Sequence, residues 1–383
     1  MDRKEFSDKK SGQLIQTPQN YWAFVPDPLP PAITFDVSLV LALSKADAAL
    51  SELSGLGSQL PNPHLLISPY IQREAVLSSR IEGTKASLSD LLIDEIEEAS
   101  SKRTSTDDIK EVRNYIRAME HGVQRMSQLP LSLRLIKEIH AELLADVRGD
   151  KATPGEFRRS QNWIGPAGST PMSAAFVPPP VQEMTECLGD WEKFLHVRDV
   201  VPDLIQCAMM HVQFETIHPF LDGNGRVGRL LITFFLLERQ RLSQPLLYLS
   251  AFIAAHKSDY YDLLQRVRTH GEWTPWLLFF LQGVTKIATE AGTQAKELNA
   301  LREQYRAQLR DKPNALGLLD NLFTNPYMTV SRATALLHKT HPTAKAAITV
   351  LEQKKILQEI TGRQWGRVYV CRPVLDALDR PFE

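Results

Sequence analysis

The stretch His218-Pro219-Phe220-Leu221-Asp222-Gly223-Asn224-Gly225-Arg226-Val227-Gly228-Arg229 decides how this chain is interpreted. The residues that follow it contain no nearby proline and predict a helix, so the glycines precede a helix N-terminus. Unpaired N–H groups and the helix dipole favour an anion there, and Gly223 and Gly225 let the backbone turn towards it. Arg226 and Arg229 are three residues apart, so both can hold the same polyphosphate. The stretch predicts a phosphate-binding site.

Two further side chains of this stretch carry chemistry. Asp222 is a hard oxygen ligand of the kind that Mg²⁺ accepts, usually together with substrate phosphates. His218 lies four residues earlier and can act as a general base near neutral pH. His211 lies about two helical turns before His218, but no third ligand is evident, so a metal site built on this histidine pair is not expected.

The glycines at 223, 225 and 228 also spell the dinucleotide fingerprint G-x-G-x-x-G. That motif follows a strand and has an acidic residue about 20 positions later. Here the apolar spacing over 203–214 is helical, and Tyr248 stands where the acid would be. A dinucleotide-binding fold is therefore not expected, and no Gly-Lys-Ser/Thr follows that would make a nucleotide-binding P-loop.

The stretch resembles the signature of the Fic family, H-P-F-x-[D/E]-G-N-G-R-x-x-R, and it matches every fixed position. The resemblance implies transfer of AMP from ATP to a Tyr, Ser or Thr hydroxyl of a target protein, or of the enzyme itself, with release of pyrophosphate. It implies that His218 takes the hydroxyl proton, that Asp222 holds Mg²⁺ against the ATP phosphates, and that Arg226 and Arg229 hold the leaving phosphates. The residues that it implies for nucleotide binding in the loop are Gly223, Asn224, Gly225, Arg226, Val227, Gly228 and Arg229.

A second stretch, Ser78-Ser79-Arg80-Ile81-Glu82-Gly83, resembles the inhibitory motif of the same family, [S/T]-x-x-x-E-[G/N]. Its spacing places Ser78 and Glu82 on one helical face, and Gly83 can cap the helix end. The resemblance implies an inhibitory helix over 69–83, in which Glu82 pairs with Arg229 and denies it to the γ-phosphate. The plainer interpretation, a solvated helix face, is the less favoured one because a complete core signature follows.

Two regions around the predicted site are assigned by resemblance. Residues 154–180 are rich in turn residues and predict a β-hairpin, which resembles the Fic flap that aligns an extended target segment by β-augmentation. Its expected edge is Ser173, Ala174, Ala175 and Phe176, although an ordinary surface loop is the alternative. Tyr260 and Tyr261 resemble the segment that contacts adenine, and core tyrosines are the alternative; His256 departs from the family, where Asn is often found.

The expected fold class is mainly α: a Fic-type helical core with a β-hairpin flap and a small C-terminal winged helix-turn-helix domain. The expected units are residues 1–64 (arm and helix), 65–290 (catalytic core), 291–310 (linker helix) and 311–383 (winged helix). Five prolines before residue 35 indicate an irregular arm. Gly55 and Gly57 are expected to end a helix that begins at Val37, and a break near residue 290 is expected to separate two later helices.

The C-terminal segment 311–383 carries ten Lys or Arg and seven Asp or Glu, a net charge of +3. Lys345, Lys354, Arg363 and Arg367 could touch a phosphate backbone. Its third helix, however, is rich in Ala and Leu and poor in side chains that read bases. Protein docking or homodimerisation is therefore favoured over DNA binding, and both stay open.

Composition bounds the remaining possibilities. The 383 residues carry a net charge of −1, which gives no global field for nucleic acid or membrane. Three scattered cysteines suit a reducing cytosol, and no apolar run is long enough to cross a bilayer, so a cytoplasmic protein without a membrane partner is expected. Two alternatives to AMP transfer remain: transfer of another phosphate-containing group, and a DNA-binding regulator whose catalytic core is secondary.

Overall fold

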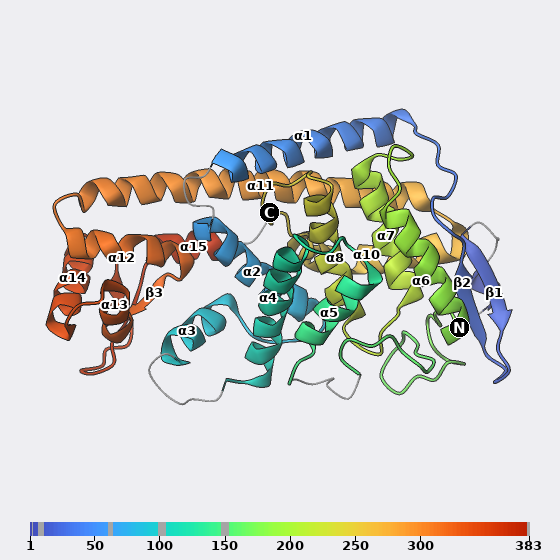
Figure 1. Cartoon of the computed structure of the whole chain (residues 1–383), viewed down its shortest axis with the longest axis horizontal. Helices are drawn as coiled ribbons and strands as arrows, with labels where there is room; N and C mark the ends of the chain where they lie inside the picture. The colour runs from blue at the N-terminus through green and yellow to red at the C-terminus, as the bar shows by residue number, and fades with distance from the viewer. Residues whose placement is uncertain (2, 7–10, 60–63, 99–104, 147–152, 381–383) are drawn as a thin grey trace.

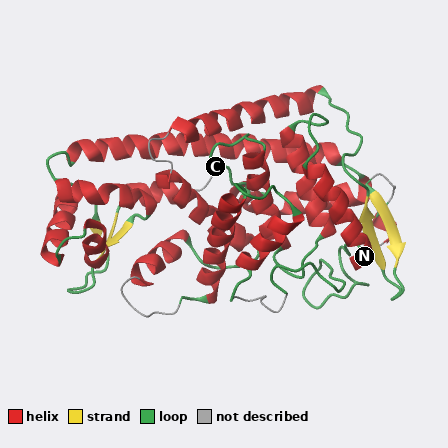
Figure 2. Ribbon diagram, in the orientation of Figure 1, coloured by secondary structure: helices red, strands yellow, loops and turns green. Residues whose placement is uncertain are grey.

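Helices dominate the computed structural model, which describes residues 1–383 apart from 2, 7–10, 60–63, 99–104, 147–152 and 381–383 (Figure 2). The helices of the larger part are α1 (Val37–Gln59), α2 (His64–Ile81), α3 (Leu88–Glu98), α4 (Asp107–Arg125), α5 (Leu133–Leu143), α6 (Val181–Leu195), α7 (Asp203–Ile217), α8 (Asn224–Glu238), α9 (Ser250–Ala255), α10 (Lys257–His270) and α11 (Trp273–Gln308). The prediction of a mainly helical protein is confirmed.

Helices α7 and α8 form the centre of the larger part, and the predicted phosphate loop joins them. Every residue of α7 from Leu204 to Ile217 is buried, polar ones such as Gln206 and His211 included, because other elements pack on its sides. Two neighbouring helices donate hydrogen bonds to carbonyls of α7. The indole N–H of Trp191 donates to the carbonyl of Met210 at 2.9 Å, and that of Trp276 donates to the carbonyl of Ala208 at 3.0 Å. The loop is thus anchored on the most deeply packed elements.

Helices α1 and α11 run side by side along one edge of the molecule (Figure 1). Both differ from the sequence prediction, because α1 passes through Gly55 and Gly57, and α11 is one unbroken helix of 36 residues across the predicted break. A Cβ on Gly57 would lie 3.0 Å from Leu246 Cδ1, and one on Gly292 would lie 3.4 Å from Leu56 Cδ1. Gly57 gives room to Leu246 of the α8–α9 loop, a Cβ on Gly292 would make an ordinary contact, and neither glycine ends its helix.

The N-terminal arm is ordered as a hairpin of strands β1 (Gly12–Gln16) and β2 (Trp22–Pro26), so the prediction of an irregular arm is wrong. Pro18 lies in the turn between the strands, and the other prolines lie at the end of β2 and beyond it, where they remove no ladder hydrogen bond. The N–H of Phe24 donates to the carbonyl of Val177 at 2.9 Å, which ties the hairpin to the flap region.

The flap region, residues 154–180, forms only one antiparallel bridge, between Ile164 and Phe176, where the sequence predicts a β-hairpin. Prolines at 166 and 171 fall between the bridged residues, and proline has no N–H for a ladder. Arg158 fixes the base of this region instead: its guanidinium donates to the carbonyls of Pro179, at 2.5 Å, and of His218, at 3.0 Å. The flap is therefore held by the Arg158 side chain in addition to a few backbone hydrogen bonds.

The C-terminal region consists of α12 (Pro313–Thr324), β3 (Tyr327–Thr329), α13 (Val330–Leu337), α14 (His341–Gln353), β4 (Gln358–Glu359), β5 (Val368–Val370) and α15 (Arg372–Asp379). The strands form an antiparallel sheet in the order β3-β5-β4, and β3 was not expected from the sequence. The apolar core runs on from the larger part into this region without a break. Of the helices in the described ranges, none is long and apolar enough to cross a bilayer.

Candidate active site

The loop between α7 and α8 is closed by Asn224 and braced by His140. The Asn224 side chain accepts a hydrogen bond from the N–H of Phe220 and donates one to its carbonyl, both at 2.8 Å. The imidazole of His140 stacks on the Phe220 ring at 3.7 Å. The N–H of Gly155 donates to His140 Nδ1 at 2.9 Å, so the proton is on Nε2, which donates to the carbonyl of Asp222 at 3.0 Å. The loop conformation is therefore set before any ligand arrives.

His218 ends α7 in the left-handed region, with φ of 49°, a strained conformation for a residue other than glycine. Arg158 Nε and Asn162 Nδ2 both donate to its carbonyl, at 3.0 and 3.2 Å, and hold it there. Its ring Nδ1 lies 3.3 Å from the carbonyl of Glu215 and donates to it, which leaves Nε2 as a proton acceptor. Burial, assisted by the positive charge of Arg268, lowers the pKa of His218 to about 4. The imidazole is neutral at pH 7.

Arg226 lies in the first turn of α8 and has unused donors. Its side chain is 4% exposed, yet neither Nε nor Nη1 has a hydrogen-bond partner among the described residues. Nη1 lies 3.6 Å from Glu111 Oε2, and Nη2 lies 3.5 Å from Asp222 Oδ2, both too long for good hydrogen bonds. Buried guanidinium donors without partners at a helix N-terminus fit an anion with several oxygens.

Asp222 points one carboxylate oxygen at its own turn and leaves the side chain half-exposed. Oδ1 accepts from the N–H of Gly223 at 2.6 Å, and 49% of the side-chain surface is accessible. Within the described ranges, no three His, Cys, Asp or Glu side chains gather as a metal site. A single accessible carboxylate beside an anion site fits Mg²⁺ that takes its other ligands from phosphates and water.

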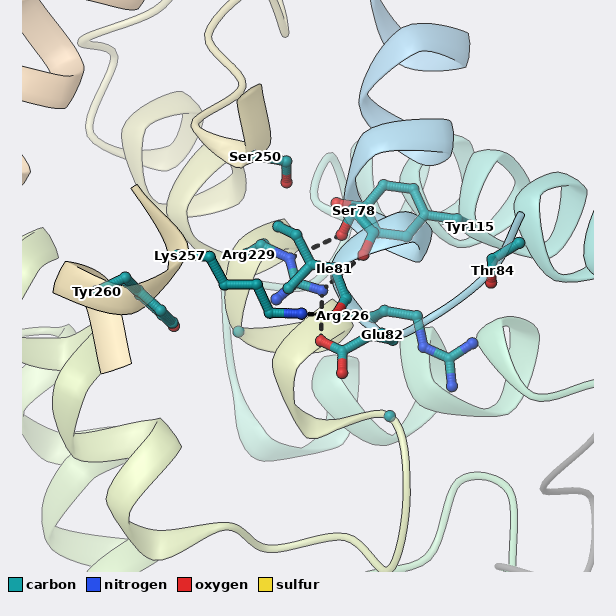
Figure 3. Close-up of polar contacts among 12 residues, drawn as sticks. Ser78, Ile81, Glu82, Thr84, Tyr115, Arg226, Arg229, Ser250, Lys257 and Tyr260 are labelled. Atoms are coloured by element: carbon teal, nitrogen blue, oxygen red, sulfur yellow. Dashed lines mark hydrogen bonds and ion pairs between the residues drawn. The ribbon is translucent and has the colours of Figure 1, made fainter. Parts of the chain in front are cut away.

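The inhibitory stretch lies directly against this loop, as Figure 3 shows. Arg229 Nε donates to Ser78 Oγ at 2.8 Å, and Nη2 donates to the carbonyl of Ser78 at 3.0 Å and to Glu82 Oε1 at 2.8 Å. Although burial opposes ionisation, Arg229 holds the pKa of Glu82 below its usual range, and Glu82 raises that of Arg229. A Cβ on Gly225 would lie only 2.5 Å from Glu82 Oε1, so this carboxylate touches the glycine loop itself.

One turn earlier in α2, Glu74 anchors the helix that carries Ser78. Its Oε1 accepts from the hydroxyls of Tyr115, at 2.9 Å, and Ser250, at 2.5 Å, which come from α4 and α9. Burial raises the pKa of Glu74 to about 7. The helix ends at Ile81, and Gly83 follows with φ of 104°. Glu82 therefore lies in the turn just beyond the helix, whereas the sequence predicted it on the helical face.

Lys257 forms a further contact with the end of α2. Its Nζ donates to the carbonyl of Ile81 at 2.7 Å, from the first residue of α10 (Figure 3). The same ammonium lies 5.9 Å from the centre of the Tyr261 ring. A cation on a C-terminal carbonyl of a helix stabilises that end, so Lys257 helps to hold Glu82 in place.

Of the two tyrosines expected near adenine, only Tyr261 is accessible, with 46% of its surface exposed. Tyr260 is buried, and its hydroxyl lies 2.9 Å from His211 Nε2. His211 Nδ1 donates to the carbonyl of Gly228, so Nε2 accepts from the tyrosine, and burial lowers the pKa of His211 to about 3. Tyr260 therefore supports α8 through His211, which is bound to the carbonyl of Gly228.

The four residues expected at the flap edge differ in their exposure to solvent. Ser173 and Ala175 are exposed, whereas Ala174 and Phe176 are buried. The guanidinium of Arg268 lies 4.2 Å from the centre of the Phe176 ring, and its nitrogens donate to Thr216 Oγ1 and to the carbonyl of Glu215, both at 3.1 Å. Arg268 thus joins the flap to the turn that carries His218.

Sequence reasoning missed His140, Lys257 and Arg268 as parts of the site. Each comes from a helix outside the two motifs, and each acts on the motifs through backbone carbonyls. The available signals were a lone histidine on the apolar face of α5 and one of two arginines near the end of α10, which single-sequence patterns cannot assign.

A helical core that presents a glycine loop, two arginines and a buried histidine at one helix N-terminus defines the class as a Fic-type fold. Two family models match the chain: Fic/DOC family N-terminal over residues 40–124, and Fic/DOC family over residues 130–236. The chain belongs to the Fic family.

Curated relatives named "Protein adenylyltransferase Fic" include one from Aedes aegypti, 32% identical over 151 residues, and one from Drosophila grimshawi, 28% identical over 178 residues. These matches cover 39% and 46% of this chain, and 27% and 33% of the relatives. The chain therefore aligns with no more than about a third of the length of either relative.

Solved structures support the fold. A Fic family protein from Desulfovibrio desulfuricans G20 has a TM-score of 0.58 at 19% identity, over 90% of this chain and 98% of that one. A Fic domain containing signaling protein from Bacteroides thetaiotaomicron VPI-5482 has a TM-score of 0.51 at 18% identity, over 68% of this chain and 97% of that one. At these identities the likeness concerns the fold alone.

Proposed function

We propose that this protein is an adenylyltransferase that moves AMP from ATP to hydroxyl groups of target proteins and of itself, and that it is held in an inhibited state. The observation that carries the proposal is the N-terminus of α8, where the unpartnered donors of Arg226 lie beside a glycine loop and a neutral histidine. The family relatives named as protein adenylyltransferases support the same activity.

His218 is the proposed general base. Its Nδ1 is committed to the Glu215 carbonyl, so Nε2 takes the proton of the attacking hydroxyl. The hydroxyl oxygen bonds to the α-phosphorus, and the bond from that phosphorus to the pyrophosphate oxygen breaks. Arg226 and the N–H groups of the loop hold the phosphates and their growing negative charge. Asp222 is the residue that would hold Mg²⁺, which neutralises phosphate charge when bound.

Arg229 is the proposed point of inhibition. In this structure its Nε and Nη2 are bound to Ser78 and Glu82, so these donors are not free for an outer phosphate. A carboxylate and a phosphate compete for the same guanidinium donors, because both present oxygens in similar geometry. We infer that the Glu82–Arg229 contact defines the inhibited state.

Mass spectrometry of intact products tests the activity. We expect that incubation with ATP and Mg²⁺ adds one AMP per modified hydroxyl to the protein itself and to targets in a lysate. Addition of a phosphate alone, or of another phosphate-containing group, contradicts AMP transfer. The targets, a homodimer and a cytoplasmic location stay predictions.

Replacement of Lys257 by Met is expected to raise self-modification by about two- to fivefold, since one charged hydrogen bond to the end of α2 is lost. The measurement is the initial rate of label transfer from ATP labelled at the α-phosphate. Lys296→Met is the matched control, because Lys296 pairs with Glu52 far from the loop. An unchanged rate in Lys257→Met would show that the Ile81 contact does not hold the inhibited state.

A further inference from the structure

Helices α13 and α14 form a helix-turn-helix at one end of the molecule (Figure 1). The turn is tight: His338 ends α13 in the left-handed region with φ of 51°, and α14 begins at His341. Strands β4 and β5 follow, and the residues between them form a loop beside the two helices. This arrangement presents α14 at the surface with a wing next to it.

The two faces of α14 differ sharply in character. Of its Ala and Leu residues, which argued against base recognition, Ala346 is exposed and the others face inward, and the buried residues are Ala344, Ala347, Ile348 and Leu351. The exposed side carries a stripe of polar side chains spaced four apart, namely His341, Lys345, Thr349 and Gln353. Residues at this spacing lie along one side of a helix, and this stripe contains no carboxylate.

A hollow of about 160 Å³ lies between α14, the start of α13 and the wing. Lys345, Arg367 and Trp365 contribute to its lining, which contains no acidic residue. Trp365 has 86% of its surface exposed, and an indole so placed is typical of a contact surface. Arg367 Nε donates to the carbonyl of Arg363 at 2.8 Å, which braces the wing.

Glu359 of β4 closes the turn that leads into the wing. Glu359 Oε1 accepts from the N–H groups of Thr361, at 2.8 Å, and Gly362, at 2.9 Å, and so closes the turn into the loop. The hydroxyl of Thr361 also donates to Oε1, and this hydrogen bond is the main cause that lowers the pKa of Glu359, so the carboxylate stays ionised. Lys345, Arg363 and Arg367 outnumber this carboxylate, so the face is positive although the whole chain is nearly neutral.

We propose that this face binds duplex DNA, with α14 in the major groove and the wing arginines on the phosphates. A helix of 13 residues is about 20 Å long, and the major groove, about 12 Å wide, admits a helix. Lys345, Arg363 and Arg367 supply phosphate contacts, and Gln353 and Thr349 supply base contacts. A protein partner would have to leave these cations unpaired or bring its own carboxylates. The inference does not rest on the proposed catalytic activity.

The test is fluorescence anisotropy of the full-length protein with a labelled 30-bp duplex of mixed sequence. At about 50 mM salt we expect binding in the micromolar range, and the double variant Lys345→Glu/Arg367→Glu should raise Kd by at least about thirtyfold. Each single change to Ala should reduce the slope of log K against log salt by about 1. Selection from a randomised duplex library should enrich different sequences for Gln353→Ala than for the wild type.

The matched control is Lys296→Glu/Arg372→Glu, which makes the same change in net charge away from this face. It should change Kd by less than about twofold. Equal weakening in both double variants, no binding by the wild type at about 10 μM protein, or displacement of the duplex by an equal concentration of single-stranded RNA would each overturn the proposal. Thermal melting of each variant shows that its fold is retained.

Discussion

Replacement of Glu82 by Gly is expected to increase AMP transfer by about ten- to a hundredfold. The change removes the carboxylate that occupies Arg229 Nη2 at 2.8 Å, and hydrogen bonds to charged groups contribute about 1.5–3 kcal/mol. Because Glu82 lies in the turn after α2, a glycine there costs no helix stability. The measurement is the initial rate of label transfer from ATP labelled at the α-phosphate, to the protein itself and to lysate proteins.

Two further variants separate charge from shape. Glu82→Gln keeps the size of the side chain and should give an intermediate rate, because a neutral amide competes less well for a guanidinium. Glu303→Gln removes the exposed carboxylate of an ion pair with Arg302 on α11 and should leave the rate unchanged. If Glu82→Gly labelled no faster than Glu303→Gln, Arg229 would not be the point of control.

The Glu82–Arg229 pair also predicts how inhibition depends on pH. Arg229 lowers the pKa of Glu82 against the opposing effect of burial, so the pair is complete above the ordinary glutamate pKa of about 4.3. It is lost only as pH falls through the lowered value. Inhibition is therefore not expected to relax between about pH 6 and pH 8, and any relief in that range has another cause.

Local signals in the sequence predicted where the two motifs lie. The signature His218–Arg229 placed the glycines at a helix N-terminus, and the motif containing Glu82 placed it against Arg229 despite a separation of 147 residues. Both predictions depend on residues that can be interpreted from a short stretch of sequence: glycines that a turn needs, and ionic groups that need a partner. The structure brings the two motifs into direct contact.

Long-range packing accounts for what the sequence could not predict. Breaks were expected at Gly57 in α1 and near residue 290 in α11, but both helices continue, and at Gly57 a side chain of another segment leaves little room for a Cβ. The β1–β2 hairpin owes part of its order to Ser11, whose hydroxyl donates to the carbonyl of Val267 at 2.7 Å. No pattern within a short window contains such partners, and the same holds for Lys257 on the end of α2.

Removal of the imidazole of His218 is expected to have the largest effect of all. In a Glu82→Gly background, which makes the uninhibited rate measurable, His218→Ala should lower AMP transfer by at least about a hundredfold, since a positioned general base contributes about 10²–10⁴. Binding of ATP should be retained, because the phosphates are held by the α8 N-terminus and the two arginines. Label transfer and the Kd for ATP are measured on the same variants.

The left-handed backbone conformation of His218 determines which substitution is the suitable control for His218→Ala. Alanine is strained at φ of 49°, whereas asparagine tolerates this region, so His218→Asn keeps the turn and removes only the base. Both variants should be equally inactive, and His121→Ala, on the surface of α4, should be fully active.

Burial lowers the pKa of His218 to about 4, so the imidazole is already a base throughout the neutral range and loses this form only in acid. A loss of activity with an apparent pKa near the ordinary 6.5, or full activity in His218→Asn, would assign the proton transfer to another group.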